Sequence, residues 1–139
     1  MILFDTNVLI YSFDPDSAFH GWARAALIGG IRGEGAAVNP VIVAELCVGD
    51  TDPPTVPDRL QHLGLHLLDL PASVATGCAR AFADYLQNRR LAGEPKISRL
   101  PLPDFFIGAH AAQLGMPLAT ADPSRYRTYF PTVDLRLPC

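Results

Sequence analysis

The chain has 139 residues, a length typical of one domain, and carries a formal net charge of −3 at pH 7. Hydrophobic residues make up 49% of the sequence and charged residues 18%, which excludes a disordered tail, and the 13 prolines and 11 glycines follow no period. Because no run of about 18 apolar residues is present, we expect a single cytoplasmic domain over residues 1–139, without a signal peptide or a membrane-spanning helix.

Short apolar runs alternate with helical patterns along the whole chain. In the first half of the chain they predict a strand at residues 1–4 that ends in a turn, a helix from an N-cap at 16–17 to 29–30, a strand at 36–38 and a helix at 41–48 opened by Asn39-Pro40. A proline-rich loop at 50–57, a helix around 59–63, a strand at 65–70 and a long helix capped by Ser73 follow. The last part holds a loop at 88–103, a helix at 104–114, a strand at 117–120, a short helix capped by Asp122-Pro123 and a strand at 133–137. Strands that alternate with helices form parallel sheets with helices on both faces. We therefore expect an α/β fold, a three-layer α/β/α sandwich around a mostly parallel sheet of four to five strands.

Four acidic residues stand out by their positions. They are Asp5, Glu45, Asp104 and Asp122. Asp5 and Asp122 each follow a predicted strand, where open α/β sheets place their ligand sites. Each acid also has a purely structural interpretation: Asp5 and Asp122 as helix N-caps, and Asp104 as a first-turn acid favoured by the helix dipole. Glu45 lies past the first turn of an apolar helix, where a salt bridge to a lysine or arginine is the alternative.

Carboxylates that converge at one edge of a sheet repel each other and can stay ionised only around cations. Oxygen ligands suit hard ions such as Mg²⁺ or Mn²⁺, which turn water into a nucleophile and stabilise the leaving oxygen of a phosphodiester. Thr6, Asn7 and Thr120 lie beside the acids and are candidates to orient them or to hold a metal-bound water. Hydrogen bonding within a turn is their structural alternative.

Five segments together resemble the PIN-domain ribonucleases and, within that family, the VapC-type toxins of bacterial toxin–antitoxin pairs. They are FDTNVL at 4–9, VAEL at 43–46, PDFFIGAHA at 103–111, TAD at 120–122 and RYRTYFP at 125–131. The resemblance spans essentially the whole chain, keeps the acids in the family's order and implies a PIN-like fold. Ala121 departs from the family's pattern, in which a basic residue is frequent at that position.

The resemblance implies a function as well as a fold. Asp5, Glu45, Asp104 and Asp122 would be the metal-binding and catalytic acids of a Mg²⁺-dependent endoribonuclease in which Mn²⁺ can substitute. The three aspartates would hold the ion or ions, and Glu45 would be a ligand or help to position the water. Family members commonly form homodimers and are inhibited by a cognate VapB-type antitoxin whose peptide enters the active-site groove. The expected substrate is a tRNA, an rRNA or an mRNA.

An acidic protein that cuts RNA needs a local positive surface, because lysines and arginines supply most sequence-independent affinity for the backbone. Six basic residues are candidates for phosphate contacts, and an ordinary solvated helix end and loop is their structural alternative. They are Arg89, Arg90, Lys96, Arg99, Arg125 and Arg127.

Two further residues follow Asp104 on its predicted helix. His110 lies six positions later, about 240° round the helix, so we expect it to face away from the acids as a packing or surface residue. Gly108, four positions after Asp104, shares the face of the acid. Its missing side chain either leaves room for substrate or serves helix packing.

Other functions are less consistent with the sequence. A haloacid-dehalogenase-like phosphatase also places an aspartate after the first strand, but it needs a second one where this chain has Asn7. A response-regulator domain would need an adjacent acidic pair there. A non-catalytic PIN-like module used only for protein binding would be indicated by lost acids, and all four are present. The three cysteines show no zinc-ligand spacing and suit a reducing compartment.

Overall fold

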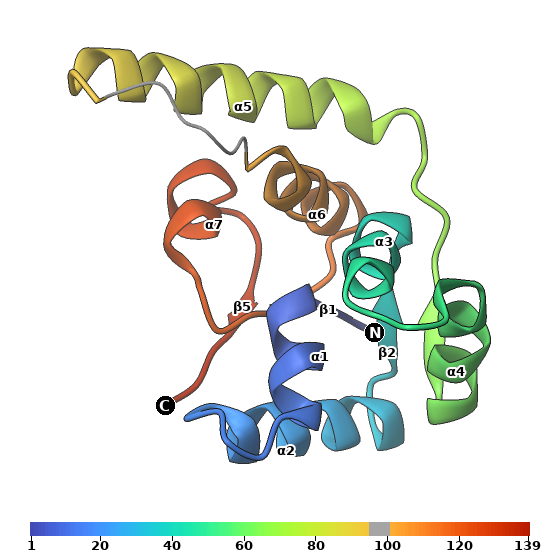
Figure 1. Ribbon diagram of the computed structural model, residues 1–139. Coiled ribbons are helices and arrows are strands. Elements are labelled where there is room, and N and C mark those ends of the chain that lie inside the picture. The colour runs from blue at the N-terminus through green and yellow to red at the C-terminus, as the bar shows by residue number, and fades with distance from the viewer. Residues whose placement is uncertain (95–100) are drawn as a thin grey trace.

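Five parallel strands form the centre of the protein in a computed structural model that describes residues 1–94 and 101–139 (Figure 1). The strands are β1 (Ile2–Phe4), β2 (Ala36–Val38), β3 (Leu65–Leu67), β4 (Leu118–Ala119) and β5 (Leu135–Arg136). Their order across the sheet is β3-β2-β1-β4-β5, so β1 is central, and Leu3 is in register with Ala37 on one side and Leu118 on the other. The sheet confirms the predicted α/β class.

Helices cover both faces of this sheet. They are α1 (Thr6–Phe13), α2 (His20–Arg32), α3 (Pro40–Val48), the 3₁₀ turn η1 (Pro53–Thr55), α4 (Val56–Leu63), α5 (Val74–Leu91), α6 (Leu102–Leu114) and α7 (Ser124–Tyr129). The chain moves sideways from β1 to β3 and then returns past β1 to β4, so right-handed crossovers place the later helices on the opposite face from the earlier ones. Accordingly, α1 packs on α2 below the strands in Figure 1, and α5 packs on α6 above them. Among the helices described, none is long and apolar enough to cross a bilayer.

The strands form the core of the molecule. Every residue of β1, β2 and β4 is buried, which explains why these segments are continuous apolar runs without polar alternation. Helix α2 approaches β1 closely at Gly30, where a Cβ atom would lie 2.9 Å from the ring of Phe4. A side chain at this position would therefore separate the helix from the strand.

Local sequence signals placed some helix ends correctly. Helix α3 begins at Pro40, and the Asn39 side chain accepts a hydrogen bond from the Ile42 amide at 3.1 Å, as the Asn-Pro pair predicts. Asn39 also contacts the buried His110, whose Nδ1 lies 3.1 Å from the Asn39 amide nitrogen. His110 therefore joins α6 to the start of α3, which confirms its assignment as a packing residue.

The prediction of a turn after the first strand was wrong, because α1 begins directly at Thr6 with Asp5 as its N-cap. This helix has only eight residues, and its apolar side chains do not lie on one face: Val8 and Leu9 are buried, whereas Ile10 and Phe13 are about half exposed. Such a short helix without a clear apolar stripe gives little helical periodicity.

Several other helix ends also differ from the predictions. Helix α2 begins only at His20, with no side-chain cap, and α5 continues to Leu91 into the expected loop. Ser73 and Asp122 do not cap backbone groups of α5 and α7. Helices α4 and α6 begin earlier than expected because each holds a proline in its first turn, where no backbone N–H is needed.

Candidate active site

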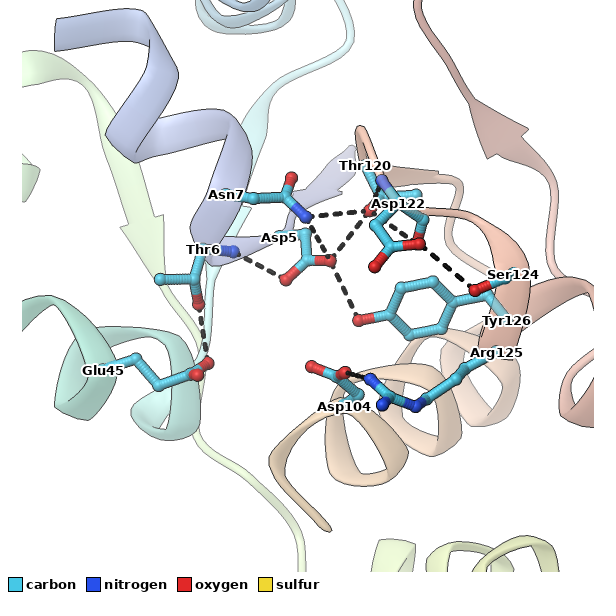
Figure 2. A network of polar contacts seen from close by, with 10 residues as sticks. All are labelled: Asp5, Thr6, Asn7, Glu45, Asp104, Thr120, Asp122, Ser124, Arg125 and Tyr126. Carbon is cyan, nitrogen blue, oxygen red and sulfur yellow. Dashed lines mark hydrogen bonds and ion pairs between the residues drawn. The ribbon is translucent and has the colours of Figure 1, made fainter. Parts of the chain in front are cut away.

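Asp5 and Asp122 lie at the carboxyl edge of the sheet, where β1 and β4 are neighbours. The chain leaves β1 toward β2 on one side, whereas β4 and β5 lie on the other, so this edge is the topological switch point of the sheet. Open α/β sheets leave a crevice for ligands at such a point. Figure 2 shows the carboxylates of Asp5, Glu45, Asp104 and Asp122 pointing toward one another here.

Asp5 is the centre of a hydrogen-bond network and is only 5% exposed. Its Oδ1 accepts from the Thr6 amide at 2.7 Å, which is the N-cap bond of α1. Its Oδ2 accepts from the hydroxyls of Thr120 at 2.9 Å and Tyr126 at 3.0 Å, and from the Asn7 amide group at 3.3 Å. Four donors from three elements therefore fix this carboxylate in one orientation.

The pKa of Asp5 is raised to about 6, chiefly by burial and to a lesser extent by the negative charge of Asp104. The hydrogen bonds from Thr120, Tyr126 and Thr6 act in the opposite direction and hold the pKa down. The donors thus compensate only part of the cost of burying the charge. A positive charge placed beside Asp5 would offset the remainder.

Asn7 joins the first turn of α1 to the loop after β4. Its Oδ1 accepts from the Ala121 amide at 3.1 Å, and its Nδ2 lies 3.3 Å from the Thr120 hydroxyl oxygen. That oxygen also accepts from the Asp122 amide at 3.1 Å, which shapes the turn after β4. The Asp122 carboxylate itself is free of this network and accepts from the Ser124 hydroxyl at 3.2 Å. The start of α1 and the loop after β4 are therefore connected through side chains that are neither acidic nor basic.

Glu45 reaches the site from the middle of α3 and is half-buried. The Thr6 hydroxyl donates to its Oε1 at 2.7 Å. The salt bridge weighed as the structural alternative is not present among the residues described, because no lysine or arginine there pairs with Glu45. Glu45 is held instead by a neutral donor next to Asp5.

Asp104 lies in the first turn of α6 and pairs with Arg125 of α7, with 2.7 Å between Oδ2 and Nη1. Burial raises the pKa of Asp104, the charge of Asp122 raises it as well, and Arg125 lowers it. The Arg125 guanidinium also lies over the ring of Tyr85 at 5.9 Å. Arg125, predicted as a phosphate contact, therefore contacts one of the four acids in this structure.

The donor set fits a hard divalent cation in its chemistry. All four side chains offer carboxylate oxygens, and a cation would offset the burial and the mutual repulsion that raise the pKa values of Asp5 and Asp104. Their present arrangement is more open: within residues 1–94 and 101–139, no three acids, histidines or cysteines are grouped closely enough to hold one ion. Binding a cation would therefore require at least one carboxylate to turn inward.

The remaining candidate residues are the other basic residues and Gly108. Arg89 pairs with Glu94 and lies over Tyr85, Arg90 and Arg127 are exposed, and Lys96 and Arg99 lie outside the described residues. Gly108 packs against Phe130, whose ring would overlap a Cβ atom at that position. Its missing side chain thus serves helix packing and does not leave room for substrate.

Sequence reasoning missed Tyr126 as a member of this site. Its ring is buried, and its hydroxyl donates to Asp5 across 121 positions of sequence. Burial, followed by the charges of Asp5 and Asp104, raises the pKa of Tyr126 well above its ordinary value, so the hydroxyl keeps its proton at neutral pH. The one available signal was its position one helical turn after Asp122.

Comparisons with known proteins agree with this architecture. The sequence model described as the PIN domain matches residues 2–131. Curated proteins provide no significant sequence match. Similar solved structures include VapBC2 from Rickettsia felis bound to a DNA fragment from their promoter (17% identity, TM-score 0.64, all of both chains covered) and a toxin–antitoxin complex from Klebsiella pneumoniae (22%, 0.60, 96% of this chain and 95% of that chain). VapC20 of Mycobacterium tuberculosis, described as a sarcin–ricin loop cleaving toxin, is 13% identical with a TM-score of 0.64, and the match covers 96% of this chain and 99% of VapC20. At these identities the solved structures establish the likeness of fold.

Proposed function

The chain belongs to the PIN domain family, and on that premise we propose that it is a metal-dependent endoribonuclease, the toxin of a VapBC-type toxin–antitoxin pair. The observation that carries the proposal is the arrangement of four acids at the switch point of the sheet, with buried Asp5 at its centre (Figure 2). Because the chain belongs to this family, a haloacid-dehalogenase-like phosphatase is no longer a candidate, and the missing second aspartate already disfavoured it.

In this proposal, Asp5, Asp104 and Asp122 hold one or two divalent cations, Mg²⁺ or Mn²⁺, and Glu45 is a further ligand or positions the attacking water. When bound, such a cation lowers the pKa of a water molecule and offsets the charge that develops on a phosphodiester. Oxygen-only ligands and partly uncompensated negative charge support this choice of cofactor.

The neutral side chains of the site act by fixing the acids. Thr120 and the protonated Tyr126 hydroxyl hold Asp5 through its Oδ2, and Thr6 holds Glu45 through its Oε1. Asn7 holds the start of α1 against the loop after β4. Asp5 and Glu45, which are fixed in this way, do not have to be ordered again when the cation and the RNA bind, which favours both binding and reaction.

The similar structures support the choice of substrate and partner. VapC20 is described as a toxin that cleaves the sarcin–ricin loop, which favours RNA as the substrate class. VapBC2 and the Klebsiella complex favour a cognate VapB-type antitoxin as the partner of this chain. A homodimer is proposed from the same family resemblance.

The proposal is tested by incubating structured tRNA, rRNA and mRNA fragments with the protein in Mg²⁺ or Mn²⁺, and with EDTA as the metal-free control. Asp5→Asn removes the central charge, and Asp69→Asn makes the same change at an exposed acid away from the site. We expect cleavage by wild type and Asp69→Asn in the presence of metal, and none by Asp5→Asn or with EDTA. Cleavage that persists in Asp5→Asn or in EDTA would contradict the proposal.

One observation favours a second candidate, a PIN-like module that binds proteins without catalysis. Arg125 forms an ion pair with Asp104, and no three potential ligands among the described residues lie close enough together to hold one ion. Calorimetric titration with Mn²⁺ separates the two candidates. A folded protein that binds no divalent cation and cleaves no RNA would be the binding module.

A further inference from the structure

Arg125 is a positive charge inside an otherwise acidic site. It contacts Asp104 at 2.7 Å, and both side chains are partly exposed, at 39% and 32%. None of the other acids of the site, Asp5, Glu45 and Asp122, forms an ion pair within the described part of the chain. Among the described residues, Arg125 is therefore the one positive charge that pairs with an acid of the site, and that acid is Asp104.

The position of Arg125 is determined from two sides. Its neighbour Tyr126 is buried and bound to Asp5, so this first turn of α7 is held against the site (Figure 2). The guanidinium lies between the Asp104 carboxylate on α6 and the Tyr85 ring on α5. A guanidinium that lies over a ring and binds a carboxylate is held more firmly than a surface arginine with one contact.

A divalent cation cannot share Asp104 with this arginine without cost. The guanidinium donates to Oδ2, one of the two oxygens that a metal would use, and two cations at one carboxylate repel each other. To ligate a metal fully, Asp104 has to turn away from Arg125, or Arg125 has to move off toward solvent. Both side chains are partly exposed, so each has solvent on one side into which it can turn.

We propose that Arg125 is an internal competitor of the divalent cation at Asp104, which lowers the affinity of the site for metal until the arginine is displaced. The inference rests on the proposed function, since it assigns a role to Arg125 at the same metal site. Arg125 is thus a positioning residue that acts through Asp104. A partly exposed ion pair is a weak competitor, and we expect its removal to tighten metal binding by about three- to tenfold.

The test is calorimetric titration of Mn²⁺ and Mg²⁺ into the metal-free full chain, without RNA. Arg125→Gln and Arg125→Met remove the charge, and the methionine keeps an apolar stem against Tyr85. Arg125→Lys retains the charge. Arg24→Gln makes the same change in net charge at an exposed position on α2, on the other side of the sheet. Thermal unfolding of each variant shows which of them are folded and can be compared.

We expect tighter binding of both ions by the two neutral variants. Arg125→Lys, which keeps the charge without the planar contact to Tyr85, should lie between them and wild type, and Arg24→Gln should bind within about twofold of wild type. Binding by a neutral variant alone, with none by wild type, would support the same conclusion. Equal or weaker binding by the folded neutral variants, alongside measurable binding by wild type, would overturn the inference and leave the proposed metal site intact. No binding by wild type or by any folded variant would overturn both.

Discussion

The two halves of the site are built differently. The half around Asp5 is buried, and its carboxylate receives four hydrogen bonds from neutral donors on α1, α7 and the loop after β4. The half around Asp104 is partly exposed, and its carboxylate is held by the single charged side chain of Arg125. One half is therefore rigid and carries an uncompensated charge, whereas the other is adjustable and its charge is already paired.

This difference suggests that the two halves have different roles in binding a metal. A carboxylate fixed by neutral donors keeps its geometry when a cation arrives, because none of its partners is repelled. A carboxylate paired with arginine exchanges one positive partner for another, so its contribution depends on cation concentration. The rigid half defines where a metal would sit, and the adjustable half determines how readily the metal is bound.

The largest expected effect comes from removing the charge at the rigid half. Asp5→Asn should lower the rate of metal-dependent RNA cleavage by about 10³-fold or more, because several kcal/mol of charge stabilisation would be lost. Single-turnover cleavage of a target RNA at saturating Mg²⁺ measures the effect. A decrease below tenfold in a folded variant would mean that Asp5 has a structural role as the N-cap of α1 and little more.

The second prediction concerns the cost of the buried charge in the metal-free protein. Burial raises the pKa of Asp5 to about 6, so the folded state binds a proton more tightly than the unfolded chain does. Stability from this group is fully present below about pH 4, the ordinary value of a free aspartate, and is lost as the pH rises through 6. The shift corresponds to about 3 kcal/mol.

Denaturant unfolding in EDTA between pH 3 and pH 7 measures this cost when wild type is compared with Asp5→Asn. As the pH rises from 3 to 7, the free energy of unfolding of wild type should fall by about 3 kcal/mol relative to that of the variant. Addition of Mg²⁺ at pH 7 should stabilise wild type and leave the variant little changed. A constant difference between the two proteins at every pH would show that the hydrogen bonds fully compensate the buried charge.

The sequence predicted the frame of the site better than its contacts. Apolar runs placed β1 and β4, and parallel topology then brought the acids that follow them, Asp5 and Asp122, to one edge. Start signals at Asn39-Pro40 placed α3 and with it Glu45. These features depend on local patterning and general topology, which one chain reveals.

The contacts that distinguish the two halves could not be predicted, because they depend on where α7 packs. Arg125 and Tyr126 are adjacent in sequence, yet one pairs with Asp104 and the other binds Asp5. In the sequence Arg125 had the features of a surface charge and Tyr126 those of an ordinary aromatic. Side-chain direction in a helix of six residues is set by tertiary packing, which the sequence pattern alone does not specify.

The third prediction tests the neutral donors of the rigid half. Tyr126→Phe removes one hydrogen bond to a buried, charged carboxylate and should lower the free energy of unfolding by about 2 kcal/mol at pH 7. It should also raise the pKa of Asp5, because the lost donor stabilised the ionised form. Tyr129→Phe is the matched control: its hydroxyl contacts the exposed Asn88, and we expect a change below about 0.5 kcal/mol. Equal effects of the two substitutions would remove the distinction between the buried network and the surface.

The smallest expected effects lie at the adjustable half, and they differ in sign. The pKa of Asp104 is raised even beside Arg125, so burial costs more than the ion pair returns, and Asp104→Asn should stabilise the metal-free protein slightly, by less than about 1 kcal/mol. Arg125→Gln leaves Asp104 without its partner and should destabilise the protein by a similar amount. Unfolding at low and high NaCl measures both, and salt should reduce the effect of Arg125→Gln because the pair is partly exposed. A loss of several kcal/mol in both variants would instead identify the pair as a structural element as rigid as the network around Asp5, and Asp104 would then not be an adjustable ligand for the cation.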